Sequence, residues 1–233
     1  MQPETPLMAQ PNAAYAPALA RNRVLRNTYL LLAVSLLPTI AGAWLGLALN
    51  LNQLFAGHAG IFALVFLVGA YGLMFAIHAN RNSAIGVGLL LAFTFFMGAM
   101  LAPLLGVIMA MSNGVKLIAL AAGGTAAVFA TMAALGTAIK RDLGGLGKFL
   151  VIGMVMLLIA SIANLFFQMP ALMIALSVIA IGIFSVAMMY YVNQIVSGGI
   201  TNYITATLLL YIAIYNVFTN LLALLGIVGG SND

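Results

Sequence analysis

Long apolar segments, separated by short polar ones, make up nearly the whole chain. The apolar segments cover residues 28–49, 59–79, 83–111, 115–139, 149–168, 171–192 and 203–228. Each is long enough to form a transmembrane helix, which needs about 20 residues. None of them alternates apolar and polar residues with the period of two that a barrel strand requires. The pattern therefore predicts seven membrane-spanning helices.

The composition identifies the solvent of these helices. Of the 233 residues, 65% are hydrophobic and 5% are charged, whereas a soluble domain has about 25% charged residues. The chain contains no cysteine, so neither a disulfide framework nor a thiolate metal site is available. The fold class that follows is an all-α, polytopic membrane protein.

Three parts are expected along the chain: a disordered tail over residues 1–22, a transmembrane domain over residues 23–228 and a short C-terminal tail over residues 229–233. The first twenty residues contain four prolines and no apolar segment, which is typical of disorder. Arginines precede the first apolar run, as in a cleaved signal peptide. That run is 22 residues long and crosses the bilayer at full length, which favours a retained helix.

The basic residues predict the orientation of the helices in the membrane. With seven spans, one side of the membrane receives Arg21, Arg23, Arg26, Arg81, Lys140, Arg141 and Lys148. The other side receives Lys116 alone. Since loops rich in lysine and arginine stay in the cytoplasm, we expect a cytoplasmic N-terminus and a C-terminus on the opposite side.

Little in the sequence supports catalysis. The three acidic residues, Glu4, Asp142 and Asp233, all fall outside the predicted spans. His58 and His78 lie near opposite ends of the second span and cannot share a metal ion within that helix. No nucleophile and base stand in a recognisable arrangement. We therefore expect no enzyme activity, no catalytic residue, no metal site and no cofactor.

Polar side chains concentrate in the last two spans and the connection between them. They include Tyr190, Tyr191, Asn193, Gln194, Asn202, Tyr203, Tyr211, Tyr215 and Asn216. Polar groups at membrane depth usually face other helices or water. We expect Asn202, Tyr203, Tyr211, Tyr215 and Asn216 to line the interior of the bundle. Hydrogen bonding between helices is the simpler role for them, and a polar cavity is the alternative.

Two further motifs each allow two interpretations. Gly42 and Gly46 form a GxxxG pattern in the first span, which suits close packing within the chain or dimerisation. Residues 140–148 combine Lys140, Arg141 and Asp142 with glycines that permit a tight turn. This loop serves as a topological anchor, or it binds an acidic lipid or an acidic loop of a partner.

Several segments together resemble the Bax inhibitor-1 (transmembrane Bax inhibitor motif) family. They are VLRNTYLLL at residues 24–32, KRDLGGLG at residues 140–147, GGITNYITAT at residues 198–207, and LYIAIYNVF at residues 210–218 with LLG at residues 224–226. The resemblance runs from about residue 22 to residue 228, with the spans in the same number and order. Within the family the chain is most similar to the bacterial YccA-like branch, the modulators of the FtsH protease.

The resemblance implies a bundle with the last helix surrounded by six others, and it carries two functions. Some members resemble pH-sensitive calcium leak channels gated by two aspartates on the sixth and seventh helices. Those positions align with Tyr191 and Ala213 here, which cannot form a carboxylate pair that shares a proton. The residues Arg26, Asn27 and Thr28 belong to the first matching motif.

The other function is interaction with the membrane protease FtsH and its partners HflK and HflC, in the inner membrane of a bacterium. Because both sensor acids are replaced, we expect this function, with a periplasmic C-terminus, rather than a cation leak. A membrane protease driven by ATP must seize a flexible segment before it can pull. The N-terminal tail would then provide such a handle, and an inert terminus is the alternative.

Overall fold

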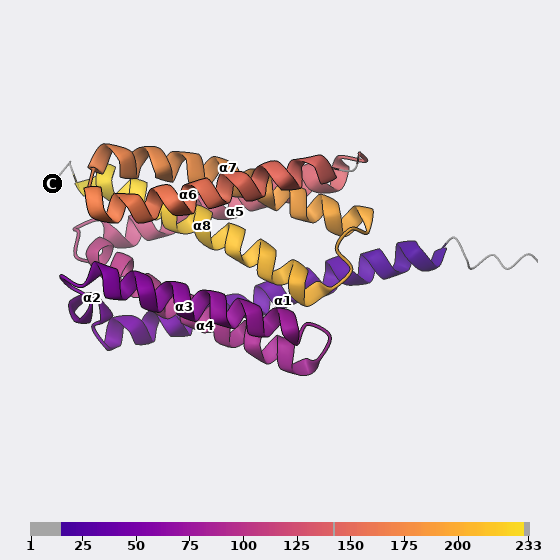
Figure 1. Ribbon diagram of the computed structural model, residues 1–233, viewed down its shortest axis with the longest axis horizontal. Helices are drawn as coiled ribbons and strands as arrows, with labels where there is room; N and C mark the ends of the chain where they lie inside the picture. Colours follow the sequence, from indigo (N-terminus) through magenta and orange to yellow (C-terminus); the bar gives the residue numbers. More distant parts are fainter. Residues whose placement is uncertain (1–14, 142, 231–233) are drawn as a thin grey trace, which may run out of the picture.

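The computed structural model describes residues 15–141 and 143–230, and this part of the chain is helical (Figure 1). The helices are α1 (Tyr15–Ala48), α2 (Leu51–Leu54), α3 (Ala59–Ala79), α4 (Ala84–Met109), α5 (Gly114–Ala138), α6 (Gly144–Phe167), α7 (Pro170–Ser197) and α8 (Tyr203–Gly230). Seven of these are long and apolar enough to cross a membrane. The chain is thus an all-α, polytopic membrane protein, as its sequence predicts.

The observed helices differ from the predicted spans mainly at their ends. Helix α1 begins at Tyr15. The prediction of a disordered tail over residues 1–22 is therefore wrong for residues 15–22, and residues 1–14 lie outside the described part. Alanine, arginine and leucine are good helix formers, and they extend α1 toward the N-terminus beyond its apolar residues. At the other end α8 extends through residues 229 and 230, and residues 231–233 are again outside the described part.

The glycine-rich stretch after residue 143 also differs from the expectation. It forms the first turn of α6, which begins at Gly144, rather than a tight turn in a loop. The connection between α5 and α6 is therefore short, and Lys148 belongs to a helix.

The short helix α2 was not predicted, because its four residues are too few to show a periodic pattern.

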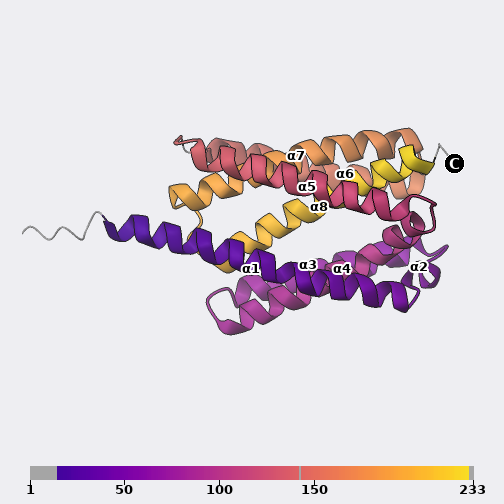
Figure 2. The same cartoon turned by 180° about the vertical axis from the view of Figure 1, so that it is seen from behind.

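The long helices form two layers with α8 between them. Helices α1, α3 and α4 make the first layer, and α5, α6 and α7 make the second; α8 runs obliquely from the first layer at its start toward the second (Figures 1 and 2). Helix α8 contacts α1, α3, α4, α5 and α7, whereas α6 packs on α7. The last helix is thus central, and α6 is the least buried of the described spans.

Glycines hold α1 directly against α4 in the first layer. A Cβ atom on Gly42 would lie 2.9 Å from the carbonyl carbon of Phe95, and one on Gly46 would lie 2.7 Å from the Cβ of Ala102. On the opposite side of this seam, a Cβ on Gly98 would lie 2.8 Å from the carbonyl carbon of Thr39. Such spacing leaves no room for a side chain, as in close helix pairs in membranes. Of the two interpretations of the GxxxG motif, the structure shows packing within the chain.

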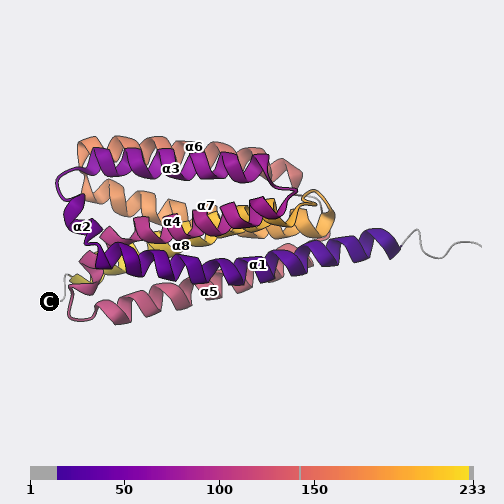
Figure 3. The ribbon, with the colours of Figure 1, turned by 90° about the horizontal axis from the view of Figure 1, so that it is seen from below.

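Every connection predicted to be cytoplasmic lies at one end of the bundle (Figure 3). The start of the first span and the α3–α4, α5–α6 and α7–α8 connections gather there, and α1 runs farthest beyond it. This end, called the basic end below, carries Arg21, Arg23, Arg26, Arg81, Lys140, Arg141 and Lys148. Lys116, near the start of α5, belongs to the opposite end.

Candidate functional site

Two asparagine side chains fix the connections at the basic end. Asn202 directly precedes α8, and its Oδ1 accepts a hydrogen bond of 3.0 Å from the backbone N–H of Thr205, which caps the helix. Its Nδ2 donates to the carbonyl oxygen of Arg81 at 2.8 Å and to Oδ1 of Asn82 at 3.0 Å. Asn202 therefore ties the start of α8 to the α3–α4 connection, at the end of the bundle rather than deep in its interior.

Asn193 has the corresponding role in the second layer, and its side chain is buried, with 1% exposure. Its Nδ2 donates to the carbonyl oxygen of Ile139 at 2.8 Å and lies 3.3 Å from that of Arg141. Its Oδ1 accepts from the backbone N–H of Leu143 at 3.4 Å. The amide thus satisfies backbone groups at the end of α5 that have no helical partner. It holds the basic loop through its backbone and leaves the charged side chains outside.

The cations of this loop and of the start of α6 are exposed. Lys140, Arg141 and Lys148 all present their side chains at the surface, and Asp142 lies outside the described residues. The sequence contains only two other acidic residues, Glu4 and Asp233. The basic end therefore offers a positively charged surface, which can attract acidic lipids or acidic protein segments.

Farther along α8, hydroxyl groups bind the backbone of the first layer. Thr207 Oγ1 lies 2.8 Å from the carbonyl oxygen of Tyr203 in its own helix and 3.3 Å from that of Thr28 in α1, and its single proton is shared between them. The hydroxyl of Tyr211 lies 2.8 Å from Thr39 Oγ1 and 3.3 Å from the carbonyl oxygen of Thr94. These contacts join α8 to α1 and α4 at the depth of the membrane, where polar groups need internal partners.

Tyr215 continues this line of contacts, because its hydroxyl donates to the carbonyl oxygen of Met97 at 3.1 Å. The rings of Tyr211 and Tyr215 stack with centroids 6.2 Å apart, and Phe93 meets Tyr211 edge-on. Tyr211 is buried, and Tyr215 is half-buried. Both therefore contribute to the polar interior that was expected from the sequence.

The remaining sequence-predicted residues are less central. Tyr203 is half-buried at the start of α8, and half-buried Asn216 donates to the carbonyl oxygen of Ile212 in its own helix. Of the N-terminal motif, Thr28 is buried and donates to Val24, while Asn27 is half-buried and Arg26 exposed.

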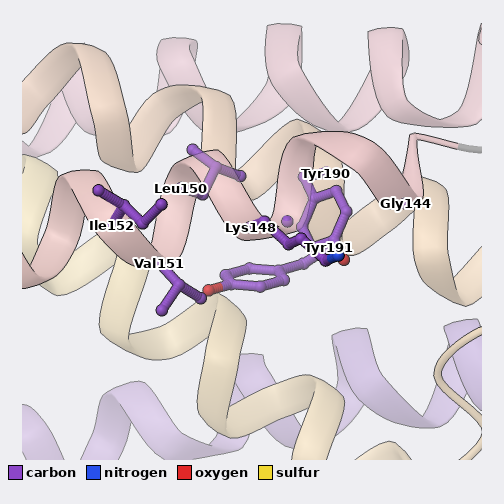
Figure 4. A pocket seen from close by; sticks show the side chains of 8 residues that line it. Gly144, Lys148, Leu150, Val151, Ile152, Tyr190 and Tyr191 are labelled. Atoms are coloured by element: carbon purple, nitrogen blue, oxygen red, sulfur yellow. The ribbon is translucent and has the colours of Figure 1, made fainter.

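Tyr191 and Ala213, which the resemblance aligns with the two sensor acids, differ in their surroundings. Ala213 is buried in the main hydrophobic core. Tyr191 is half-buried against the same core and also lines a cleft between α6 and α7, with its ring lying along α6 toward Val151 (Figure 4). Neither the phenol of Tyr191 nor the methyl group of Ala213 takes up protons near neutral pH.

The clamp formed by Asn193 was not foreseen as part of the site. The sequence placed Asn193 only within the wider polar set of the last two spans. The available signal was an asparagine next to the end of a long apolar run, which indicates a polar partner but does not identify it.

Fold and site together define a class: a multi-pass membrane protein with one basic end and a central helix that is hydrogen-bonded to its neighbours. A family model described as inhibitor of apoptosis-promoting Bax1 matches residues 21–230. The chain belongs to this Bax inhibitor family.

Relatives from several bacteria match across almost the whole chain. The modulator of FtsH protease YccA from Escherichia coli is 39% identical over 208 residues, which cover 89% of this chain and 91% of that protein. An uncharacterized protein of Neisseria meningitidis serogroup B is 39% identical over 211 residues, covering 90% of this chain and 93% of the relative. An uncharacterized protein of Pseudomonas aeruginosa is 38% identical over 224 residues, covering 96% and 97%.

Proposed function

We propose that this protein resides in the bacterial inner membrane and binds and modulates the membrane protease FtsH, together with its partners HflK and HflC. The observation that carries the proposal is the 39% identity to the Escherichia coli modulator of FtsH protease, which extends over nine-tenths of both chains. The replacement of both sensor acids, by Tyr191 and Ala213, also favours a role through protein contacts over a proton-gated leak of calcium or other cations.

The basic end supplies the surface for this contact. By the positive-inside rule this end faces the cytoplasm, which places the start of the chain there and the C-terminus in the periplasm. The clamps at Asn193 and Asn202 fix the loops that carry Lys140, Arg141 and Arg81, so the cations are presented in a defined arrangement. A fixed charged surface steers association with an acidic partner.

Modulation would arise because the protein competes as a slowly degraded substrate. A protease that pulls on the N-terminus must separate α1 from α4, where Gly42, Gly46 and Gly98 bring the backbones together. It must also break the contacts that α1 makes with α8 at Thr28 and Thr39. Breaking polar contacts in an apolar solvent is costly, so extraction of the bundle would be slow and the protease would stay occupied.

Crosslinking in native membranes followed by purification through a C-terminal tag tests the interaction. We expect FtsH and HflK/HflC to copurify with the protein. The double variant Lys140→Gln/Arg141→Gln should recover several-fold less protease, and the single variant Lys116→Gln, at the opposite end, should recover the normal amount. Absence of FtsH and HflK/HflC from the unmodified protein's pull-down would end the proposal.

A truncation tests the role of the N-terminal segment as a handle. Deletion of residues 2–14, which precede α1, should lengthen the half-life of the protein in cells containing FtsH, measured by pulse-chase. A glycine- and serine-rich segment of the same length should restore the normal half-life, because the protease requires a flexible length rather than a particular sequence. An unchanged half-life after deletion rules out the handle.

A further inference from the structure

A cleft of about 580 Å³ opens between the start of α6 and the end of α7 (Figure 4). Two kinds of groups line it. Near the start of α6, Lys148 and Tyr190 supply a cation and a hydroxyl group. Farther along α6, the ring of Tyr191 extends toward Val151, and Leu150, Val151 and Ile152 supply apolar surface (Figure 4). The cleft therefore has a polar end and an apolar end.

The polar end is suited to an anion. Lys148 is exposed in the first turns of α6, and Lys140 and Arg141 are exposed just before this helix begins. Asp142 is the acidic residue next to them in the sequence, so the segment that includes Lys148 keeps a net positive charge. The N-cap residue of α6 is Leu143, whose side chain provides no capping hydrogen bond. The start of the helix thus adds partial positive charge to that of the lysine.

Glycine shapes this end of the cleft. The ring of Tyr190 lies directly on the backbone of Gly147, where a Cβ atom would come within 2.9 Å of the ring carbon Cζ. The rings of Tyr190 and Tyr191 are tilted against each other with centroids 5.6 Å apart. Both tyrosines come from α7, so the cleft is built between two helices rather than by one helix terminus.

The apolar end is continuous with the surface that faces the lipid. Phe149 is 72% exposed, and Val151 and Ile152 are 61% and 60% exposed. In a membrane-spanning helix such side chains contact acyl chains, and tyrosines are typical of the headgroup level. The cleft therefore opens to the bilayer at the depth where phosphate groups and acyl chains meet.

We propose that this cleft binds an anionic phospholipid of the phosphatidylglycerol type. Its phosphate would contact Lys148 and the hydroxyl of Tyr190, and one acyl chain would lie along the ring of Tyr191 and the side chains of Leu150, Val151 and Ile152. An acidic protein segment would satisfy the cation but would leave the apolar, bilayer-facing surface unused. The combination of charge and apolar surface favours a lipid over such a segment.

Lipid-dependent thermal stability tests the proposal. The full-length protein is purified in neutral detergent, stripped of lipid, and titrated with phosphatidylglycerol or phosphatidylcholine while its melting temperature is followed. Since a ligand of the folded state raises the melting temperature, the titration reports affinity. Phosphatidylglycerol should act at lower concentration than phosphatidylcholine. Lys148→Gln should weaken the effect of phosphatidylglycerol by about fivefold, the value of one interfacial cation.

Two controls separate a specific cleft from general attraction. Arg23→Gln removes one exposed cation from the same end of the bundle and should leave the response to phosphatidylglycerol nearly unchanged. Inorganic phosphate, which lacks acyl chains, should not raise the melting temperature. Equal losses in Lys148→Gln and Arg23→Gln, equal effects of the two lipids, or protection by inorganic phosphate would each overturn the proposal. Stabilisation by an acidic peptide in place of the lipid would also overturn it.

Discussion

The two faces of α8 use different chemistry, although both are covered by helices. Toward the first layer, Thr207, Tyr211 and Tyr215 place hydroxyl groups on backbone or side-chain oxygens of α1 and α4. Toward the second layer, α8 packs into a cluster of aliphatic and aromatic side chains that includes Phe129 and Met132 of α5. The face toward the first layer, called the bonded face below, adds directional hydrogen bonds to apolar contacts with residues such as Leu32 and Phe93. The face toward the second layer, called the apolar face below, packs through apolar contact.

In a membrane this difference has consequences for movement. Lipid tails are as apolar as leucine, so burial of apolar surface gives little driving force between helices. A hydrogen bond fixes the position of α8 along its partner, whereas aliphatic contacts permit small shifts. We therefore expect α8 to move with the first layer and to shift, where it shifts at all, against α5 and α7.

The first prediction concerns the close packing of α1 on α4, the two helices that hydrogen-bond to α8. Gly98→Ala places a methyl group against the backbone of Thr39, which forces α1 and α4 apart. The expected loss of unfolding free energy is about 3 kcal/mol, at the upper end for an overpacked site. It is measured by denaturant titration in micelles. Gly88→Ala, in the same helix with open space around it, should be neutral or slightly stabilising. An equal loss of unfolding free energy in the two variants would contradict the close packing of α1 and α4 at Gly98.

The second prediction concerns the clamp within the second layer. Asn193→Ala removes a buried amide that serves both Ile139 and Leu143, and these backbone groups lose their partners. We expect a loss of about 2 kcal/mol, within the usual cost of unsatisfied buried polar groups. Asn220→Ala is the matched control, since that amide donates to Asn216 in its own helix, and it should cost clearly less. A cost for Asn193→Ala no larger than the control's would show that the loop is held by other contacts.

The number, order and class of the membrane-spanning helices could be predicted from the sequence, because a bilayer imposes a length and an apolar composition on every span. The observed α3 has the predicted bounds, residues 59–79. The start of α1 and the start of α6 could not be located in the same way. Outside the hydrocarbon, capping residues and local helix propensity determine where a helix ends. The apolar pattern does not indicate the position of such an end.

The candidate site could be predicted only in its composition. The sequence indicates that Tyr211 and Asn202 need partners at or near membrane depth, but several helices could have provided them. The partners lie far along the chain, at Thr39 and Arg81, and follow from the way the layers pack. The role of Asn193 depends on the short α5–α6 connection, which becomes visible only once α6 is known to begin at Gly144.

The last and smallest prediction tests the bonded face directly. Tyr211→Phe keeps the ring but removes the hydroxyl next to Thr39 and Thr94. The expected loss is about 1 kcal/mol, within the measured range for hydrogen bonds between membrane helices. Tyr71→Phe, at an exposed position on α3, should have no effect, and Met132→Leu on the apolar face should cost less than Tyr211→Phe.

A double variant tests whether the packing of α1 on α4 and the hydrogen bond between α1 and α8 depend on each other. Gly98 contacts the backbone of Thr39, and the Thr39 hydroxyl contacts Tyr211, so displacement of α1 by Gly98→Ala should already break the bond to Thr39. Gly98→Ala/Tyr211→Phe should therefore cost less than the sum of the single variants, because residues that share a partner are not independent. Strict additivity would mean that α8 keeps its bond to α1 when the seam opens. In that case the bonded face would be the more adaptable of the two, and the direction of movement inferred for α8 would have to be reversed.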